Sequence, residues 1–349
     1  MKEKLLLFYL SANDRHFVFT KFIDELLKSK HVHKIKLLIV NSTEDSSFYD
    51  SYLNDINIDY EFKYIPCPQD NYLPKVQCAI EYAKLYNYSY IMKYDNDILM
   101  PAYTLDFILE NLQELDRDDV ATISPTITTG IPSVEYFIDD FFLDDSLVKK
   151  VREEFKKCEF HVQPNVMDYR PMNICTINNL NDWNYLDYYS KLNEYIDILP
   201  DFGNGRTVYN FCKFYKGIHP IRHGFGNSII NDYIIENRER FFQKKSCSLI
   251  SDNSPYLCDM CFVIRTDNYD SLMNKENLII DGCDEVPVNR FAWNNNKKHN
   301  IIKGGYTIHI TYNWRWVLNN VYGGSNIDKP LVSLEDYEQD FISRLYDSN

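Results

Sequence analysis

The feature that most constrains the fold of this chain is an alternation of strand and helix patterns over its first hundred residues. Four segments have the length and composition of strands: KLLLFYLS (4–11), KIKLLIV (34–40), YEFKYIP (60–66) and YSYIMKYD (88–95). Between them, segments 14–29 and 73–86 place apolar residues at helical spacing. Successive strand–helix–strand units predict an α/β fold, with a mostly parallel, Rossmann-like sheet and helices on both faces.

The alternation becomes less regular after about residue 105. A helix pattern at 105–115 and a strand pattern at 120–128 come first, and strand patterns return at 256–266 and 306–313. The acidic segment from about 326 is typical of a terminal helix. We find no repeat and no low-complexity linker in the sequence, so we expect one compact unit of two interleaved halves.

Composition and charge exclude several classes of protein. The 349 residues are 45% hydrophobic and 25% charged, which is typical of a soluble globular protein. The formal charge of −14 argues against a nucleic-acid partner, because phosphate binding needs clustered Lys and Arg. Without an export signal, a membrane-spanning apolar run or a paired cysteine framework, the sequence predicts a cytoplasmic protein. A weak peripheral association with the inner face of a membrane is left open, as is the oligomeric state.

Two carboxylates follow the strand pattern at 88–95 directly. In YIMKYDNDILMP (90–101), Asp95 and Asp97 flank Asn96, a residue that tolerates turns. A turn here would let both carboxylates face one bound group. A site that offers carboxylate oxygens and leaves other coordination positions free suits Mg²⁺ or Mn²⁺. Ligands of parallel sheets bind at the carboxyl ends of the strands, where this pair is expected. The alternative is a solvated turn.

The first hundred residues resemble family-2-type glycosyltransferases of the GT-A fold. FYLSANDR (8–15) is similar to their first strand and Asn-Arg turn, LLIVNSTED (37–45) to their second strand, and YIMKYDNDILMP to their Asp-x-Asp strand. The resemblance implies that Asp97 binds a divalent metal carrying the diphosphate of a nucleotide sugar. It implies that Asp95 contacts the ribose or a metal-bound water.

Two later segments resemble the same family. IIDGCDEVPVNRF (279–291) is similar to the Gly-then-acidic-pair segment before the acceptor-side helix, and YTIHITYN (306–313) to the late strand that carries a histidine. The resemblance implies that His309 is the third metal ligand, that Glu285 is the catalytic base and that Asp284 helps to orient the acceptor. The further Glu-Asp that many relatives carry just after this pair is replaced here by Val-Pro-Val-Asn. The acids could instead stabilise an exposed helix start through its dipole.

Four other residues are candidates for nucleotide contacts. Asn13, Asn41 and Asp45 follow the first two strands and could bind the base or the ribose, or could serve as turn and cap residues. Lys75 lies near the start of the helix before the Asp-x-Asp strand and could contact a phosphate or the base, or could be a solvated lysine.

These observations together predict a metal-dependent glycosyltransferase, most simply an inverting hexosyltransferase. The donor would be a nucleotide-diphosphate sugar, UDP-linked as a first choice, and the acceptor a hydroxyl of a glycan or glycolipid in bacterial-type polysaccharide biosynthesis. We divide the chain into a donor half at 1–105, an acceptor half at 106–325 and a helical tail at 326–349. The alternatives are a sugar nucleotidyltransferase, although its Gly-rich loop is missing after the first strand, a metal hydrolase, and a non-catalytic glycan- or nucleotide-binding module of the same fold.

Overall fold

The computed structural model describes most of the two ends of the chain and little of its middle. The described residues are 5–11, 15–67, 72–128, 133–142, 225–252, 260–273, 284–310 and 334–346, isolated positions between 144 and 257, and three short strands between 159 and 216. The short strands β7 (Glu159–His161), β8 (Thr176–Ile177) and β9 (Tyr215–Lys216) pair in the order β8-β7-β9.

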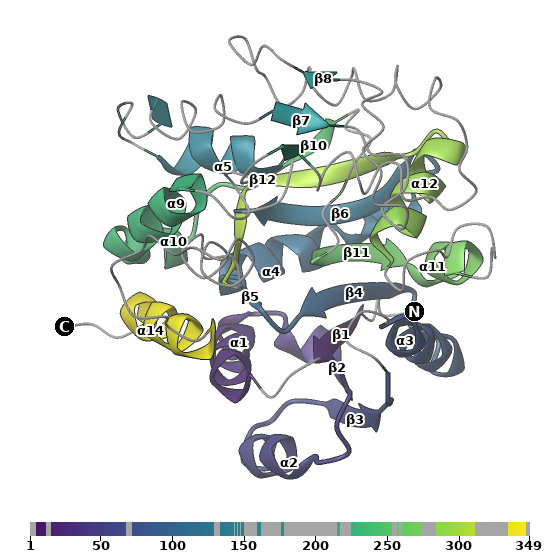
Figure 1. The fold of residues 1–349 in the computed structure, drawn as a ribbon. Coiled ribbons are helices and arrows are strands. Elements are labelled where there is room, and N and C mark those ends of the chain that lie inside the picture. Colours follow the sequence, from purple (N-terminus) through teal and green to yellow (C-terminus); the bar gives the residue numbers. More distant parts are fainter. Residues whose placement is uncertain are drawn as a thin grey trace.

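A nine-stranded sheet forms the centre of the molecule (Figure 1). Its order is β10-β12-β6-β11-β4-β1-β2-β3, and β5 pairs with β12 beside this path. The strands are β1 (Leu5–Ser11), β2 (Ile35–Asn41), β3 (Tyr60–Tyr64), β4 (Tyr90–Asp95), β5 (Ile98–Leu99), β6 (Val120–Ile127), β10 (Ser248–Asp252), β11 (Cys261–Arg265) and β12 (Lys298–His309).

Most strands of this sheet run in one direction. β1, β2, β3 and β4 pair in parallel. β11 is antiparallel to both β4 and β6, so β6 runs the same way as β4, and β12 is parallel to β6. The carboxyl ends of β1, β2, β4, β6 and β12 therefore meet at one edge, which is where a parallel sheet binds ligands.

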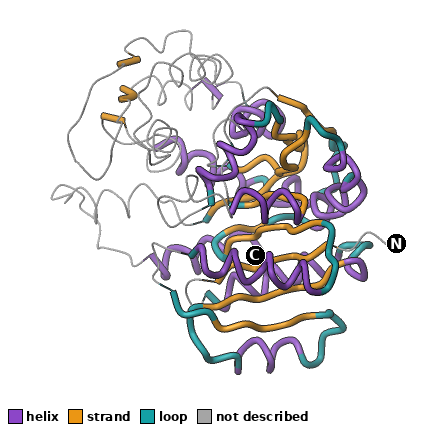
Figure 2. Tube along the Cα trace, turned by 90° about the vertical axis from the view of Figure 1, so that its right-hand side faces the viewer, coloured by secondary structure: helices purple, strands orange, loops and turns teal. Residues whose placement is uncertain are grey.

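Helices cover both faces of the sheet. Alternate strand residues point to opposite faces and form two apolar cores, one beneath α1, α2 and α4 and the other beneath α3, α11 and α12 (Figure 1). Figure 2 shows the strands stacked one above another with helices alongside. The helices are α1 (His16–Lys28), η1 (Val32–Lys34), α2 (Ser47–Leu53), α3 (Leu73–Leu85), α4 (Ala102–Glu110), η2 (Leu112–Asp116), α5 (Ser133–Phe141), α9 (Phe225–Glu236), α10 (Arg238–Phe242), α11 (Thr266–Met273), α12 (Glu285–Asn294) and α14 (Leu334–Tyr346).

Strand β12 bends before it reaches the carboxyl edge. Its register with β6 shifts between Ile302 and Tyr306, and Gly304 lies in this interval with φ +80°. A Cβ atom at Gly304 would lie 2.5 Å from the carbonyl oxygen of Ser246, so both the conformation and the space favour glycine. Beyond the bend, the last residues of β12 pair with β5.

The α/β class predicted from the sequence, with a mostly parallel sheet between helices, is confirmed. All four early strands and both early helices form within two residues of their predicted ends, whereas α2 was not predicted. The helix expected at 105–115 is α4 followed by the 3-10 turn η2, and the strand expected at 306–313 begins earlier, at Lys298. The segment expected to form a terminal helix contains α14.

None of the helices described by the structure combines the length and the apolar character that a membrane crossing requires.

Candidate active site

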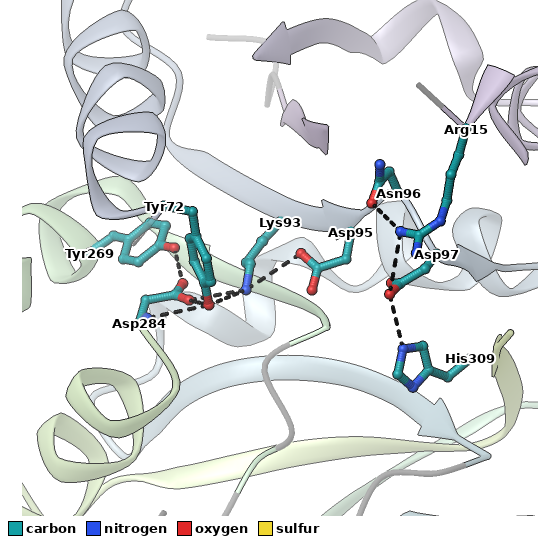
Figure 3. A network of polar contacts seen from close by, with 9 residues as sticks. All are labelled: Arg15, Tyr72, Lys93, Asp95, Asn96, Asp97, Tyr269, Asp284 and His309. Carbon is teal, nitrogen blue, oxygen red and sulfur yellow. Dashed lines mark hydrogen bonds and ion pairs between the residues drawn. The ribbon is translucent and has the colours of Figure 1, made fainter. Parts of the chain in front are cut away.

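The turn after β4 lies at the carboxyl edge, with β12 beside it. Antiparallel pairing sets His309 opposite Ile98 in β5, and the amide of Ile310 donates to the carbonyl oxygen of Asp97 at 2.9 Å. The imidazole Nε2 of His309 lies 3.2 Å from Oδ2 of Asp97 (Figure 3). The backbone thus brings together two of the metal ligands predicted from the sequence.

The spacing of these two side chains fits one divalent ion. Adjacent ligands in an octahedron with bonds of about 2.1 Å lie about 3 Å apart, close to the 3.2 Å between Asp97 and His309. A carboxylate oxygen with an imidazole nitrogen suits Mn²⁺ better than Mg²⁺, which prefers oxygen ligands.

Asp95 is oriented differently from Asp97. Its Oδ1 lies 3.5 Å from the ammonium of Lys93, and its amide donates to the carbonyl oxygen of Met260 (Figure 3). Over the part of the chain that the structure describes, no group of three or more His, Cys, Asp or Glu side chains could hold a metal ion. Of the predicted ligands Asp95, Asp97 and His309, the structure therefore brings the last two together, and a metal-binding role for Asp95 stays a prediction.

Arg15 also contacts this turn, and it is not among the site residues predicted from the sequence. Its Nη1 donates to Oδ1 of Asn96 at 3.1 Å and lies 3.8 Å from Oδ2 of Asp97. Its Nε and Nη2 donate to the two carboxylate oxygens of Glu338, at 2.9 and 3.2 Å. Burial alone would lower the pKa of Arg15, but the negative charges of Asp97 and Glu338 outweigh it and raise that pKa. The guanidinium is therefore a fixed positive charge beside the proposed metal ligands.

Asp284 lies in a buried network rather than at an open surface. Its side chain is 0% exposed, and it accepts hydrogen bonds from the hydroxyls of Tyr72 and Tyr269 and from the ammonium of Lys93 at 3.0 Å (Figure 3). Lys93 is also 0% exposed and lies between Asp284 and Asp95. The network joins the start of α12 to the strand that carries the Asp-x-Asp turn.

The other predicted catalytic residue follows immediately. Glu285 is the first residue of α12, and the carbonyl oxygen of Asp284 accepts the amide of Val288 in the first turn of that helix. The side chain of Glu285 lies outside the described residues. Its role as a base, and any role of Asp284 toward an acceptor, stay predictions.

Three of the four residues proposed for nucleotide contacts have partners within the protein. The Asn41 amide donates to the hydroxyl of Thr43, and Asp45 accepts the amide of Ser47 at 2.8 Å. Hydrogen bonds from the Ser47 hydroxyl and then from its amide lower the pKa of Asp45. Lys75 is 1% exposed and donates to the carbonyl oxygen at the end of β1, and burial lowers its pKa.

The contacts of Asn41 and Asp45 are those of turn residues, and Lys75 connects α3 to the end of β1. Nucleotide binding by these three residues stays a prediction. The fourth residue, Asn13, lies outside the described residues.

No protein-family model matches this sequence, and no curated protein sequence is similar to it. Among solved structures, a mannosyltransferase from Pyrobaculum calidifontis in complex with GDP-Man and Mn²⁺ is similar over 36% of each chain, with 13% identity and a TM-score of 0.30. TarS from S. aureus is similar over 98% of this chain and 70% of its own, with 10% identity and a TM-score of 0.40. GalNAc-T7 with UDP, GalNAc and Mn²⁺ is similar over 97% of this chain and 54% of its own, with 11% identity and a TM-score of 0.45.

Proposed function

We propose that this protein is a metal-dependent glycosyltransferase that moves a sugar from a nucleotide-diphosphate donor to a hydroxyl of a glycan. The observation that carries the proposal is the 3.2 Å approach of Asp97 and His309 at the carboxyl edge of a parallel sheet. The two residues lie far apart in sequence, and each falls in a segment that resembles the matching part of family-2-type glycosyltransferases.

Asp97 and His309 would hold the ion, most simply Mn²⁺. When bound, such an ion neutralises charge on a diphosphate leaving group. Arg15 adds a fixed positive charge on the other side of Asp97, and Lys75 secures the end of β1. Asp95 would contact the donor ribose, since its carboxylate is directed away from the Asp97 and His309 pair.

Glu285 is the proposed base that accepts the proton of the acceptor hydroxyl, which gives an inverting reaction. The residue before it is anchored by the buried contact of Asp284 with Lys93. Because Lys93 belongs to the strand that ends in Asp95, this contact would fix the start of α12 relative to the donor site. We therefore assign Asp284 to positioning the start of α12, and we propose that Glu285 performs the proton transfer.

Isothermal titration calorimetry with UDP, GDP, CDP and CMP, with and without Mn²⁺, tests the proposal. We expect one nucleoside diphosphate to bind in a manner that requires Mn²⁺, and Asp97→Asn to abolish that binding. Asp340→Asn makes the same charge change on an exposed helix surface and should leave it unchanged. Binding of every nucleotide without Mn²⁺, or binding of no nucleotide with or without Mn²⁺, would refute the donor site.

Turnover then distinguishes an enzyme from a binding module. Once the nucleotide that binds is known, its sugar derivative is tested as a substrate. In the presence of Mn²⁺ it should release the nucleoside diphosphate, either by transfer of the sugar to an acceptor or by slow hydrolysis. Metal-dependent binding with no release from any nucleotide sugar would favour the non-catalytic module.

A further inference from the structure

The C-terminal helix α14 buries a carboxylate within an apolar stripe. Glu338, Phe341, Ile342 and Leu345 lie at positions i, i+3, i+4 and i+7, and all four are buried, with Glu338 1% exposed. A carboxylate in such a stripe is costly to bury unless it has a cation and hydrogen bonds. The cation that pairs with Glu338 therefore indicates what α14 contributes to the structure.

That partner is Arg15, which lies 323 residues away in the sequence. The two hydrogen bonds from Nε and Nη2, at 2.9 and 3.2 Å, match the planar guanidinium to the planar carboxylate. The Arg15 side chain is only 12% exposed, so solvent screens this pair weakly. Figure 1 shows α14 alongside α1, the helix that Arg15 precedes.

The third nitrogen of the same guanidinium faces the proposed metal site. Nη1 of Arg15 lies 3.8 Å from Oδ2 of Asp97, and that same oxygen lies 3.2 Å from His309 (Figure 3). Arg15 is thus held more closely by Glu338 than by Asp97. A guanidinium and a divalent ion would compete for one oxygen, so the position of Arg15 controls whether that oxygen is available.

We propose that Glu338 is a positioning residue for the metal site, which makes α14 part of that site. It holds the charge of Arg15 away from Asp97 and leaves the cluster of Arg15, Glu338 and Asp97 with a net negative charge that attracts a cation. This inference rests on the proposed metal-dependent function, and it assigns a role to a helix outside the segments that resemble glycosyltransferases.

The test is the affinity of the full-length protein for Mn²⁺, measured from the EPR signal of free Mn²⁺ with and without UDP. We expect Glu338→Gln to weaken Mn²⁺ binding by roughly tenfold, the lower end of the range for direct partners of metal ligands, because Glu338 acts through Arg15. Asp340→Asn removes the same charge from the exposed side of α14 and should change the affinity little. Circular dichroism and thermal melting of each variant verify that it is folded.

A double variant separates charge control from general damage to the helix. If Glu338 acts by restraining Arg15, then Arg15→Gln combined with Glu338→Gln removes the competing guanidinium and should bind Mn²⁺ more tightly than Glu338→Gln alone. An unchanged affinity in Glu338→Gln, an equal loss in Asp340→Asn, or a double variant as weak as Glu338→Gln or weaker would overturn the inference while leaving the proposed function intact. Absence of Mn²⁺ binding by the wild-type protein would overturn both.

Discussion

Replacement of Lys93 by methionine should destabilise the protein more than any surface lysine replacement. The side chains of Lys93 and Asp284 are both 0% exposed, and their charged atoms lie 3.0 Å apart. Lys93→Met removes the cation from a carboxylate that stays buried. Breaking a buried pair from one side costs roughly 3–5 kcal/mol, out of a total stability of about 5–15 kcal/mol for a typical protein.

The matched control is Lys84→Met. The ammonium of Lys84 lies 2.6 Å from Asp270, but the Lys84 side chain is 53% exposed, so the loss should be about 0–1 kcal/mol. Urea unfolding followed by tryptophan fluorescence measures both variants under the same conditions. A third variant, Lys93→Met with Asp284→Asn, also removes the charge of the fully buried Asp284 carboxylate and should recover part of the stability. Equal stability of the two single variants, or a double variant no more stable than Lys93→Met, would refute the reasoning.

Two further predictions concern the β12 region. Burial lowers the pKa of His299 to about 3 from an unfolded value of about 6.5, so its contribution to stability is complete above about pH 6.5 and declines as the pH falls toward 3. When the pH is lowered from about 7.5 to about 5, the free energy of unfolding in urea should fall by roughly 2 kcal/mol more for the wild-type protein than for His299→Gln. An equal fall in the two proteins would contradict the burial of a neutral imidazole. Gly304→Ala should lower the free energy of unfolding by about 1–3 kcal/mol, because alanine is strained at φ +80° and its Cβ would meet Ser246. A gain in stability in the same assay would show that the bend does not need glycine.

The fold could be predicted from the sequence where the pattern is local. The apolar runs at 5–11, 35–40 and 90–94 are buried on both sides of the sheet, so their composition alone marks them as strands. Helix α2 was missed because only Tyr49 and Leu53 are buried in its seven residues, which is too short a pattern to detect. The start of β12 was missed because Gly304 and the register shift interrupt its pattern.

The site could be predicted from the sequence only in part, because many of its contacts join residues far apart in the chain. The position of Asp97 follows from the strand before it, and His309 was selected by resemblance. The contacts of Arg15 with Glu338 and of Lys93 with Asp284 span 323 and 191 residues, and no local pattern encodes such pairs. One signal was available: an acidic residue in the apolar stripe of α14 needs a buried cation as its partner.

The acid pair at 284 and 285 shows the same limit. Acids at a helix start are usually exposed and interact with its dipole, so the pattern gave no indication that Asp284 is 0% exposed. Its burial depends on Tyr72, Tyr269 and Lys93, which come from three other parts of the chain. An acidic residue at a helix start can therefore be fully buried, and the local sequence does not distinguish this case from an exposed acid.

Electron–nuclear double resonance of bound Mn²⁺ tests whether Asp97 and His309 bind one divalent ion. With protein labelled with ¹⁵N at histidine, we expect the signal of a directly coordinated imidazole nitrogen, which disappears in His309→Gln and is retained in His299→Gln. We also expect Asp97→Asn to weaken Mn²⁺ binding. Bound Mn²⁺ without a histidine nitrogen, or with a nitrogen signal unchanged in His309→Gln, would show that His309 is not a ligand.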